Sequence, residues 1–117
     1  MQYLLAVYID GNAIASITSG EQVTLNRDSI EYDQELTRSG HYIHSNALQP
    51  PQTAVTVRAR NGKFSTTDGP FAETKEHLGG FILVEARDMN EAIELAAKIP
   101  VGQFGCIEVR PIMTIPR

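Results

Sequence analysis

The chain has no tryptophan, one cysteine, three histidines and a formal net charge of −4. A single cysteine excludes an internal disulfide and a cysteine-based zinc site, and Cys106 lies in an alternating apolar segment where a structural thiol is the common use. No apolar run approaches the ~20 residues of a membrane span. The ten basic residues are scattered, whereas nucleic-acid binding needs a basic patch. Neither a membrane nor a nucleic acid is therefore expected as a partner.

The length and composition of the chain fit one globular domain over residues 1–117, because 42% of the chain is hydrophobic and 21% is charged. The opening segment, residues 1–10, lacks a basic region and is too short for a signal peptide, so it predicts a strand. We expect a cytoplasmic protein.

Hydrophobic periodicity and turn residues divide the chain into strands and helices. A loop is expected from Asp10 to about Gly20, and a helix from about Glu21 to Ser39 that ends at Gly40. Asn61-Gly62 predicts a tight hairpin, and Asp88 with Glu91 predicts a capping box at the start of a second helix. Met89, Ala92, Ile93, Ala96 and Ile99 form the predicted apolar face of that helix. The expected strands are residues 2–9, 41–48, 54–60, 63–67, 81–85 and 105–113.

This order is β-α-β, a hairpin, then β-α-β, which predicts an α+β sandwich of the ferredoxin-like kind. Residues 2–9 and 81–85 are apolar on both faces, so they are expected at the centre of the sheet. Leu25, Tyr32 and Leu36 share one side of the first helix, and Val23 and Ile30 lie nearly opposite. One of these two stripes should face the sheet, and the other a loop or a partner subunit. The helices cover only one face of the sheet. The other face is left apolar, which predicts a homodimer.

The segment 68–76, Asp-Gly-Pro-Phe-Ala-Glu-Thr-Lys-Glu, is chemically the densest part of the chain. Its Gly and Pro predict a turn, and carboxylates, a hydroxyl and an ammonium follow on one connection, as in loops that carry sites. Asp68 either caps the amides of this turn or serves as a carboxylate base with a partner in a closed pocket. A solvated loop anchored by Phe71 is the remaining alternative.

Residues 67–76, followed by Leu-Gly-Gly-Phe at 78–81, resemble the signature of the YCII-related proteins of the DGPF type. The resemblance extends over nearly the whole chain, including Ala-Leu-Gln-Pro-Pro at 47–51 and Ile-Glu-Val-Arg-Pro at 107–111. It implies a dimeric α+β barrel of ferredoxin-like subunits. Many such proteins are encoded near alternative sigma factors, and some carry a transcription label that the acidic charge does not support.

In related YCII proteins the resemblance implies a His–Asp acid/base pair, and one distant branch removes chloride from a chlorinated hydroxyquinol. Asp68 matches the aspartate of the DGPF signature. The histidine of that pair lies near the start of the first helix, but residues 21–40 contain no histidine and have Asn26, Arg27 and Asp28 there instead. A pair in this chain would need His41, His44 or His77.

If the protein is an enzyme, we expect Asp68 to abstract or relay a proton with a nearby histidine as its partner, and His77 lies in the same short segment. Lys75 or backbone amides would stabilise an enolate-like charge. His41 and His44 point to opposite faces of a strand, so no metal is expected, and the absence of a cofactor motif predicts no cofactor. The predicted ligand-binding residues are Tyr8, His41, His44, Phe71, Glu73, Thr74 and Glu76.

The predicted function is lyase- or isomerase-like proton transfer, or simple binding of a small molecule, at the 68–77 loop. The alternative is a non-catalytic binding or regulatory module that contacts a protein partner, including a transcription-related one.

Overall fold

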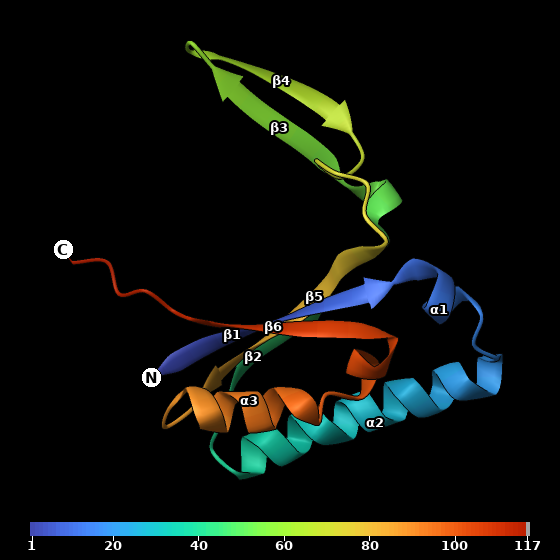
Figure 1. Cartoon of the computed structure of the whole chain (residues 1–117), viewed down its shortest axis with the longest axis vertical. Coiled ribbons are helices and arrows are strands. Elements are labelled where there is room, and N and C mark those ends of the chain that lie inside the picture. Colours follow the sequence, from blue (N-terminus) through green and yellow to red (C-terminus); the bar gives the residue numbers. More distant parts are fainter. Residues whose placement is uncertain (117) are drawn as a thin grey trace.

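The computed structural model of the chain describes residues 1–116 and contains a four-stranded sheet, three helices and a separate hairpin (Figure 1). The chain also contains two 3-10 turns, Pro51–Thr53 and Pro100–Phe104. The strands and helices, in chain order, are β1 (Gln2–Asp10), α1 (Gly11–Ala15), α2 (Ser19–Arg38), β2 (Tyr42–Ala47), β3 (Val55–Arg60), β4 (Lys63–Asp68), β5 (Glu76–Glu85), α3 (Met89–Ala97) and β6 (Gly105–Pro111).

The main sheet is antiparallel in the order β2-β5-β1-β6. The α+β class is confirmed, and so is the prediction that the two strands apolar on both faces are central. Helices α2 and α3 lie on one side of this sheet, and the β3–β4 hairpin lies on the other (Figure 1). We use "open face" for the side of the main sheet turned away from the helices.

The core lies between the helices and one face of the sheet. Alternation along β1 sends Tyr3, Leu5 and Val7 to this side, where all three are buried. Of the two stripes on α2, the one with Leu25, Tyr32 and Leu36 is buried against the sheet, whereas Val23 and Ile30 are exposed. From α3, Ala92 and Ala96 of the predicted apolar face are buried. The Tyr32 hydroxyl also donates a 2.6 Å hydrogen bond to the Leu95 carbonyl, which links the two helices.

Local capping residues set the ends of α2. Thr18 and Glu21 form a reciprocal capping box, each side chain accepting from the other's backbone N–H at 3.1 Å. This box starts the helix at Ser19, two residues before the predicted start. At the other end Gly40 has φ +81, as predicted for a left-handed cap.

Four expectations were wrong in detail. Residues 11–15 form a short helix rather than a loop, because the Asp10 side chain accepts from two backbone amides at its start. Residues 76–80 are not loop but extend β5, since they pair with the end of β1. Ile93 is 50% exposed instead of lying in the core. At α3 the Asp88 cap is confirmed, because its carboxylate accepts from the Glu91 N–H at 2.9 Å, but the Glu91 side chain accepts from the Arg87 amide, one residue before the predicted partner.

The hairpin is confirmed at Asn61-Gly62, where both residues have positive φ. Its strands β3 and β4 pair only with each other in residues 1–116 and form a second sheet. We call residues 55–68 the arm. Among the helices of residues 1–116, none combines the length and apolarity that a membrane span requires.

Gly40→Ala should destabilise the protein by about 1–2 kcal/mol, because an L side chain is strained at positive φ. Gly20→Ala is the matched control, since Gly20 lies inside α2 with open space around it. There alanine should stabilise by about 0.5–1 kcal/mol. Urea unfolding of the three proteins measures both effects. Equal effects of the two substitutions would contradict the cap assignment.

Candidate functional site

A cavity of about 480 Å³ lies between α2 and the helix-side face of the main sheet. It exists because the sheet has small residues at this point: Gly80 of β5 pairs with Val7 on one side and with Ala47 on the other. A Cβ on Gly80 would meet the Asn46 carbonyl oxygen at 2.7 Å, so the backbones are closely packed there. The result is a concave space with a mainly apolar lining.

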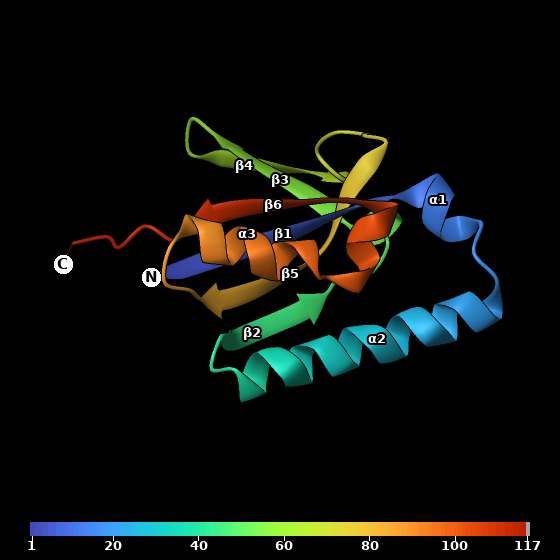
Figure 2. The ribbon, with the colours of Figure 1, turned by 60° about the horizontal axis from the view of Figure 1, so that its bottom comes forward.

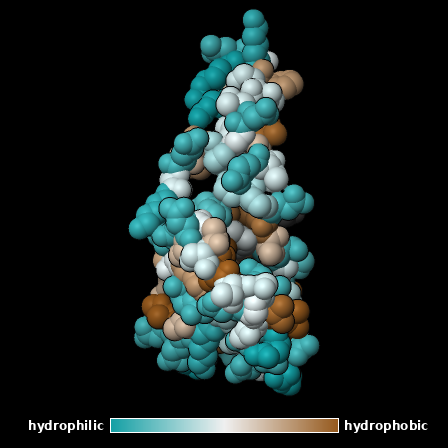
Figure 3. All heavy atoms as spheres, turned by 90° about the vertical axis from the view of Figure 1, so that its right-hand side faces the viewer, coloured by the Kyte–Doolittle hydropathy of each residue, from teal (hydrophilic) through white to brown (hydrophobic). Residues whose placement is uncertain are grey.

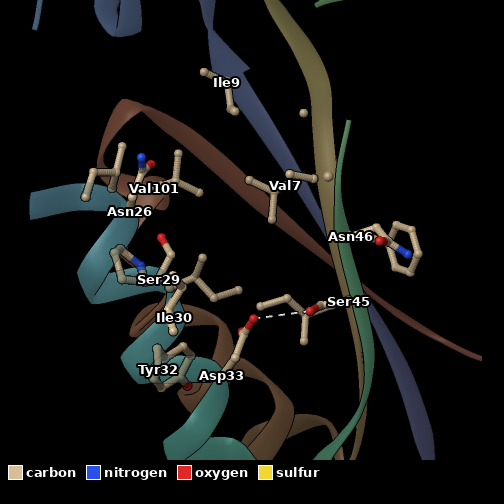
Figure 4. Close-up of a pocket in the computed structure, with 18 of the residues that line it drawn as sticks. Val7, Ile9, Asn26, Ser29, Ile30, Tyr32, Asp33, Ser45, Asn46 and Val101 are labelled. Atoms are coloured by element: carbon tan, nitrogen blue, oxygen red, sulfur yellow. Dashed lines mark hydrogen bonds between the residues drawn. The ribbon is translucent and has the colours of Figure 1, made fainter. Parts of the chain in front are cut away.

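Asp33 of α2 is the carboxyl group at this cavity. It points from the helix toward β2, where the Ser45 hydroxyl donates a 3.2 Å hydrogen bond to its Oδ2 (Figure 4). Ser45 Oγ also lies 2.8 Å from the Tyr42 hydroxyl. Because Ser45 has only one proton to donate, Tyr42 donates to Ser45 in this arrangement. Three side chains thus form a hydrogen-bonded chain that ends at a carboxylate.

Burial raises the pKa of the Asp33 carboxyl above its ordinary value, and the hydrogen bond from Ser45 opposes this shift in part. The neighbouring Tyr32 has its pKa raised to about 12, first by burial and then by the charges of Glu35 and Asp33. Tyr32 therefore keeps its proton at neutral pH. Asp33 is the carboxyl group that lines this cavity, and its raised pKa makes it the candidate there for proton exchange.

Further polar side chains at the cavity come from α2. Gln22 donates a 2.8 Å hydrogen bond to Asn26, and Ser29 lies one turn further along. Figure 4 shows Asn26, Ser29, Ile30 and Asp33 along the helix side that borders the cavity. Polar side chains thus lie along the helix wall, opposite the apolar sheet wall that includes Val7.

The sequence analysis missed Asp33, although a signal was present. Asn26, Ser29, Ile30 and Asp33 are spaced i, i+3, i+4 and i+7, which places them on one helix face. That face borders the buried stripe of α2. This spacing does not reveal the cavity opposite the helix face, because the small residues that border it, Ala47 and Gly80, come from other parts of the chain.

The predicted catalytic residues lie elsewhere, around the base of the arm. Asp68 ends β4 and is exposed; within residues 1–116 its carboxylate forms no hydrogen bond or ion pair, with histidine or with its own loop. The loop is held instead by Gly69 N–H to the Ala54 carbonyl (2.7 Å) and by Thr56 Oγ1 to the Gly69 carbonyl (2.9 Å).

The other two predicted catalytic residues face the end of β1. Lys75 Nζ lies 3.7 Å from Asp10 Oδ2, and the His77 ring is next to Gly11, where an added Cβ would lie 3.6 Å from its Cε1. Among the described residues no hydrogen bond or ion pair connects Asp68 with Lys75 or His77. Whether these three act together stays a prediction.

A second depression, of about 590 Å³, lies between the arm base and the open face. It brings together most of the predicted ligand-binding residues, and it includes His77. The residues of this groove that the sequence analysis selected are Tyr8, Phe71, Thr74, Glu76 and His77.

The remaining predicted ligand-binding residues lie outside this groove. Glu73 borders a smaller adjacent depression. His41 contacts Glu91 at 3.3 Å, and His44 lies on the open face, 2.8 Å from Asn46 Nδ2 and beside the Phe81 ring. Within residues 1–116, no three His, Cys, Asp or Glu side chains are placed to hold a metal ion.

Comparison with known proteins adds three findings. A family model described as the YCII-related domain matches residues 1–116. An uncharacterised protein of Rhizobium meliloti (strain 1021) is 31% identical over 114 residues, which cover 96% of this chain and 92% of that protein.

The third finding is a solved structure, 5-chloro-2-hydroxyhydroquinone dehydrochlorinase from Burkholderia phenoliruptrix AC1100 in complex with 2,5-dihydroxybenzoquinone. It superposes with a TM-score of 0.54 at 14% identity, over 97% of this chain and 94% of the other. At that identity the similarity shows a shared fold.

Asp33→Asn should stabilise the protein at pH 7. With a folded-state pKa raised above the unfolded one, Asp33 costs stability as pH rises through the window between the two values. Asparagine is uncharged and keeps the hydrogen bond from Ser45. The expected gain in Tm at pH 7 is about 1–3 °C, since the group is only partly buried, and the gain should vanish at pH 3.

The matched control is Asp28→Asn on the same helix, whose carboxylate lies 3.4 Å from Arg27 and outside the cavity. Differential scanning calorimetry across pH 3–8 compares the three proteins. An Asp33→Asn protein that is no more stable than wild type at pH 7 would show that the carboxyl is not strained by burial.

Proposed function

The chain belongs to the YCII-related domain family, and we propose that it binds a small ring-shaped molecule in the cavity between α2 and the sheet and moves a proton on it through Asp33. The observation that carries this proposal is the Tyr42–Ser45–Asp33 chain at the wall of a mainly apolar cavity. A carboxyl group with a raised pKa at such a place is suited to general acid–base work.

The proton path follows from the hydrogen bonds. As a carboxylate, Asp33 accepts a proton from a C–H or O–H group of the bound molecule. Protonated Asp33 then returns the proton to another atom, as an isomerase does, or loses it after the electron pair left behind has expelled a leaving group, as a lyase does. Ser45 stabilises the charged form of Asp33, and Tyr42 orients Ser45.

The lining indicates the class of ligand. A volume of about 480 Å³ lies within the range of pockets that bind small molecules. The backbone floor at Gly80 and Ala47 favours a flat molecule, while Asn26 and Ser29 offer hydrogen bonds at the opposite wall. The solved structure with the same fold is a dehydrochlorinase in complex with 2,5-dihydroxybenzoquinone, which supports a hydroxylated or quinone-like ring.

The protein is also proposed to work as a homodimer that joins two open faces into an α+β barrel. The support is the apolar character of that face, where Leu4, Phe81 and Leu83 are only partly covered and Leu78 is 44% exposed. A location in the cytoplasm stays a prediction.

A second candidate function is ligand binding without catalysis at the groove beside the 68–77 loop. The observation that favours it is the convergence there of five residues selected from the sequence, among them Phe71, which is 81% exposed. The alternative of a regulatory module that contacts a protein partner would use the same exposed surface.

Isothermal titration calorimetry with 2,5-dihydroxybenzoquinone as the ligand tests whether the cavity is the binding site. Ala47→Leu should weaken binding at least about tenfold, or ~1.4 kcal/mol, because the larger side chain fills the space under Gly80. Asp33→Asn should remove the pH dependence of binding, whereas Asp28→Asn should bind as wild type does. If Ala47→Leu binds the ring with unchanged affinity, the cavity is not the site. Chloride release from 5-chloro-2-hydroxyhydroquinone tests the catalytic half.

The variant Asp68→Asn distinguishes the second candidate function, ligand binding beside the 68–77 loop, from binding in the cavity. If the loop is a binding or catalytic site, this change should abolish ligand binding or turnover while the melting temperature stays nearly unchanged, because the carboxylate forms no bond within residues 1–116. A large loss of thermal stability would instead assign Asp68 a structural role. Binding of the ring compound unaffected by Asp68→Asn, but weakened by Ala47→Leu, would place the site in the cavity.

A further inference from the structure

The arm stands apart from the rest of the molecule. It forms its own two-stranded sheet and is joined to the body by the Pro51–Thr53 turn and the 69–75 connection. Viewed from the side, it is the narrow upper part of the molecule above a broader base (Figure 3). The radius of gyration is 16.2 Å, whereas a compact chain of this length has about 13 Å. One copy alone therefore leaves the arm without a surface to pack against.

The two faces of the arm differ in chemistry. Register pairs Val57 with Thr66 and Ala59 with Phe64, so these residues share one face with Val55. Asp68, the partner of Val55, lies on the same face at the arm base. Val55, Val57 and Phe64 are 57%, 62% and 75% exposed. Isolated two-stranded ribbons are marginal in water, and an exposed apolar face on one indicates an interaction surface.

The opposite face is basic, and it includes Arg58, Arg60 and Lys63. Residues 55–68 contain three basic side chains and one acidic, a net charge of +2. Since the whole chain carries −4, the remainder carries −6. The arm as a whole and the body of a second copy therefore attract each other at long range, while the contact itself is made by the apolar face.

The position of the arm matches this partner. The arm lies on the open-face side of the sheet, opposite the helices (Figures 1 and 2). The groove at its base is lined by Tyr8 and Leu78 of the open face, by Val55 of the arm and by Phe71 of the 69–75 connection. A body seated against the open face would thus meet the apolar side of the arm.

We propose that the arm is a dimer clamp, in which the Val55–Val57–Phe64 face of each copy packs on the second copy and the two-fold symmetry makes the contact mutual. This inference rests on the proposed homodimer. It goes beyond that proposal because it assigns a surface outside the main sheet, and it gives the hairpin a role that the fold of one copy does not explain.

Sedimentation velocity over a range of concentrations tests the clamp in the full-length chain. The double variant Val57→Asp/Phe64→Asp should raise the dimer dissociation constant at least about 100-fold. The control Ser65→Asp/Thr67→Asp adds the same two charges to the opposite face of the arm and should change it far less. The melting temperature of the body should stay similar in both, because these residues lie outside the core.

The outcomes separate the clamp from the dimer itself. A wild-type chain that is monomeric at all concentrations overturns both. A wild-type dimer that Leu83→Asp dissociates, but Val57→Asp/Phe64→Asp does not, overturns the clamp and keeps the open-face interface. An equal loss of dimer affinity in the Ser65→Asp/Thr67→Asp control also overturns the assignment of the apolar face as the contact surface.

Cross-linking provides a readout that does not depend on affinity. Cys106 is the only cysteine and is exposed on the open face, opposite Tyr8 in the register. Thr66→Cys places a thiol on the apolar face of the arm. With a short bismaleimide and a mixture of ¹⁵N-labelled and unlabelled chains, the clamp predicts a 66–106 link between copies. A link found only within one copy, or none, would overturn the placement.

Discussion

The antiparallel pairing of β1 with β5 is the constraint on which the other elements depend. These two strands are the centre of the sheet, and each is apolar on both sides, so neither side is stable in contact with water. The helices cover one side. Because β5 runs to Glu76 alongside the end of β1, the same pairing also brings the 68–77 loop and the arm base to the end of β1.

The irregularity in this pairing shapes both depressions. The register shifts between Val7 and Tyr8, so Val7 pairs with Gly80, Tyr8 pairs with Leu78, and Gly79 is passed over. Val7 and Gly80 border the cavity on the helix side, while Tyr8 and Leu78 border the groove on the open face. A Cβ on Gly79 would collide with the Ile9 side chain, so a larger residue where the two strands fall out of step would force Ile9 to move.

The sequence was sufficient wherever one short segment determines the outcome. Asn61-Gly62 sets the hairpin, Thr18 with Glu21 starts α2, and the two-sided apolar strands identify the sheet centre. It was insufficient where distant segments combine. Glu76–Gly80 has low strand propensity and becomes a strand only because β1 is there to pair with it. Asp33 is a site candidate only because Ala47 and Gly80, far along the chain, leave space opposite it.

Alternation of side chains along each strand also separates the proposed ligand cavity, on one face of the sheet, from the proposed dimer interface on the other. On β2, Ser45 faces α2 and holds Asp33, whereas its neighbours His44 and Asn46 face the open side and bond to each other. Ser45 and Asp33 therefore lie on the cavity side of the sheet, and His44 lies on the side proposed for the interface. A substitution on one face leaves the chemistry of the other face in place, and only a change to the shared glycines of β5 would disturb both. The polar groups of the 68–77 loop lie at the arm base, beside the end of β1, and the register sets Asp68 opposite Val55 at the margin of the apolar face of the arm.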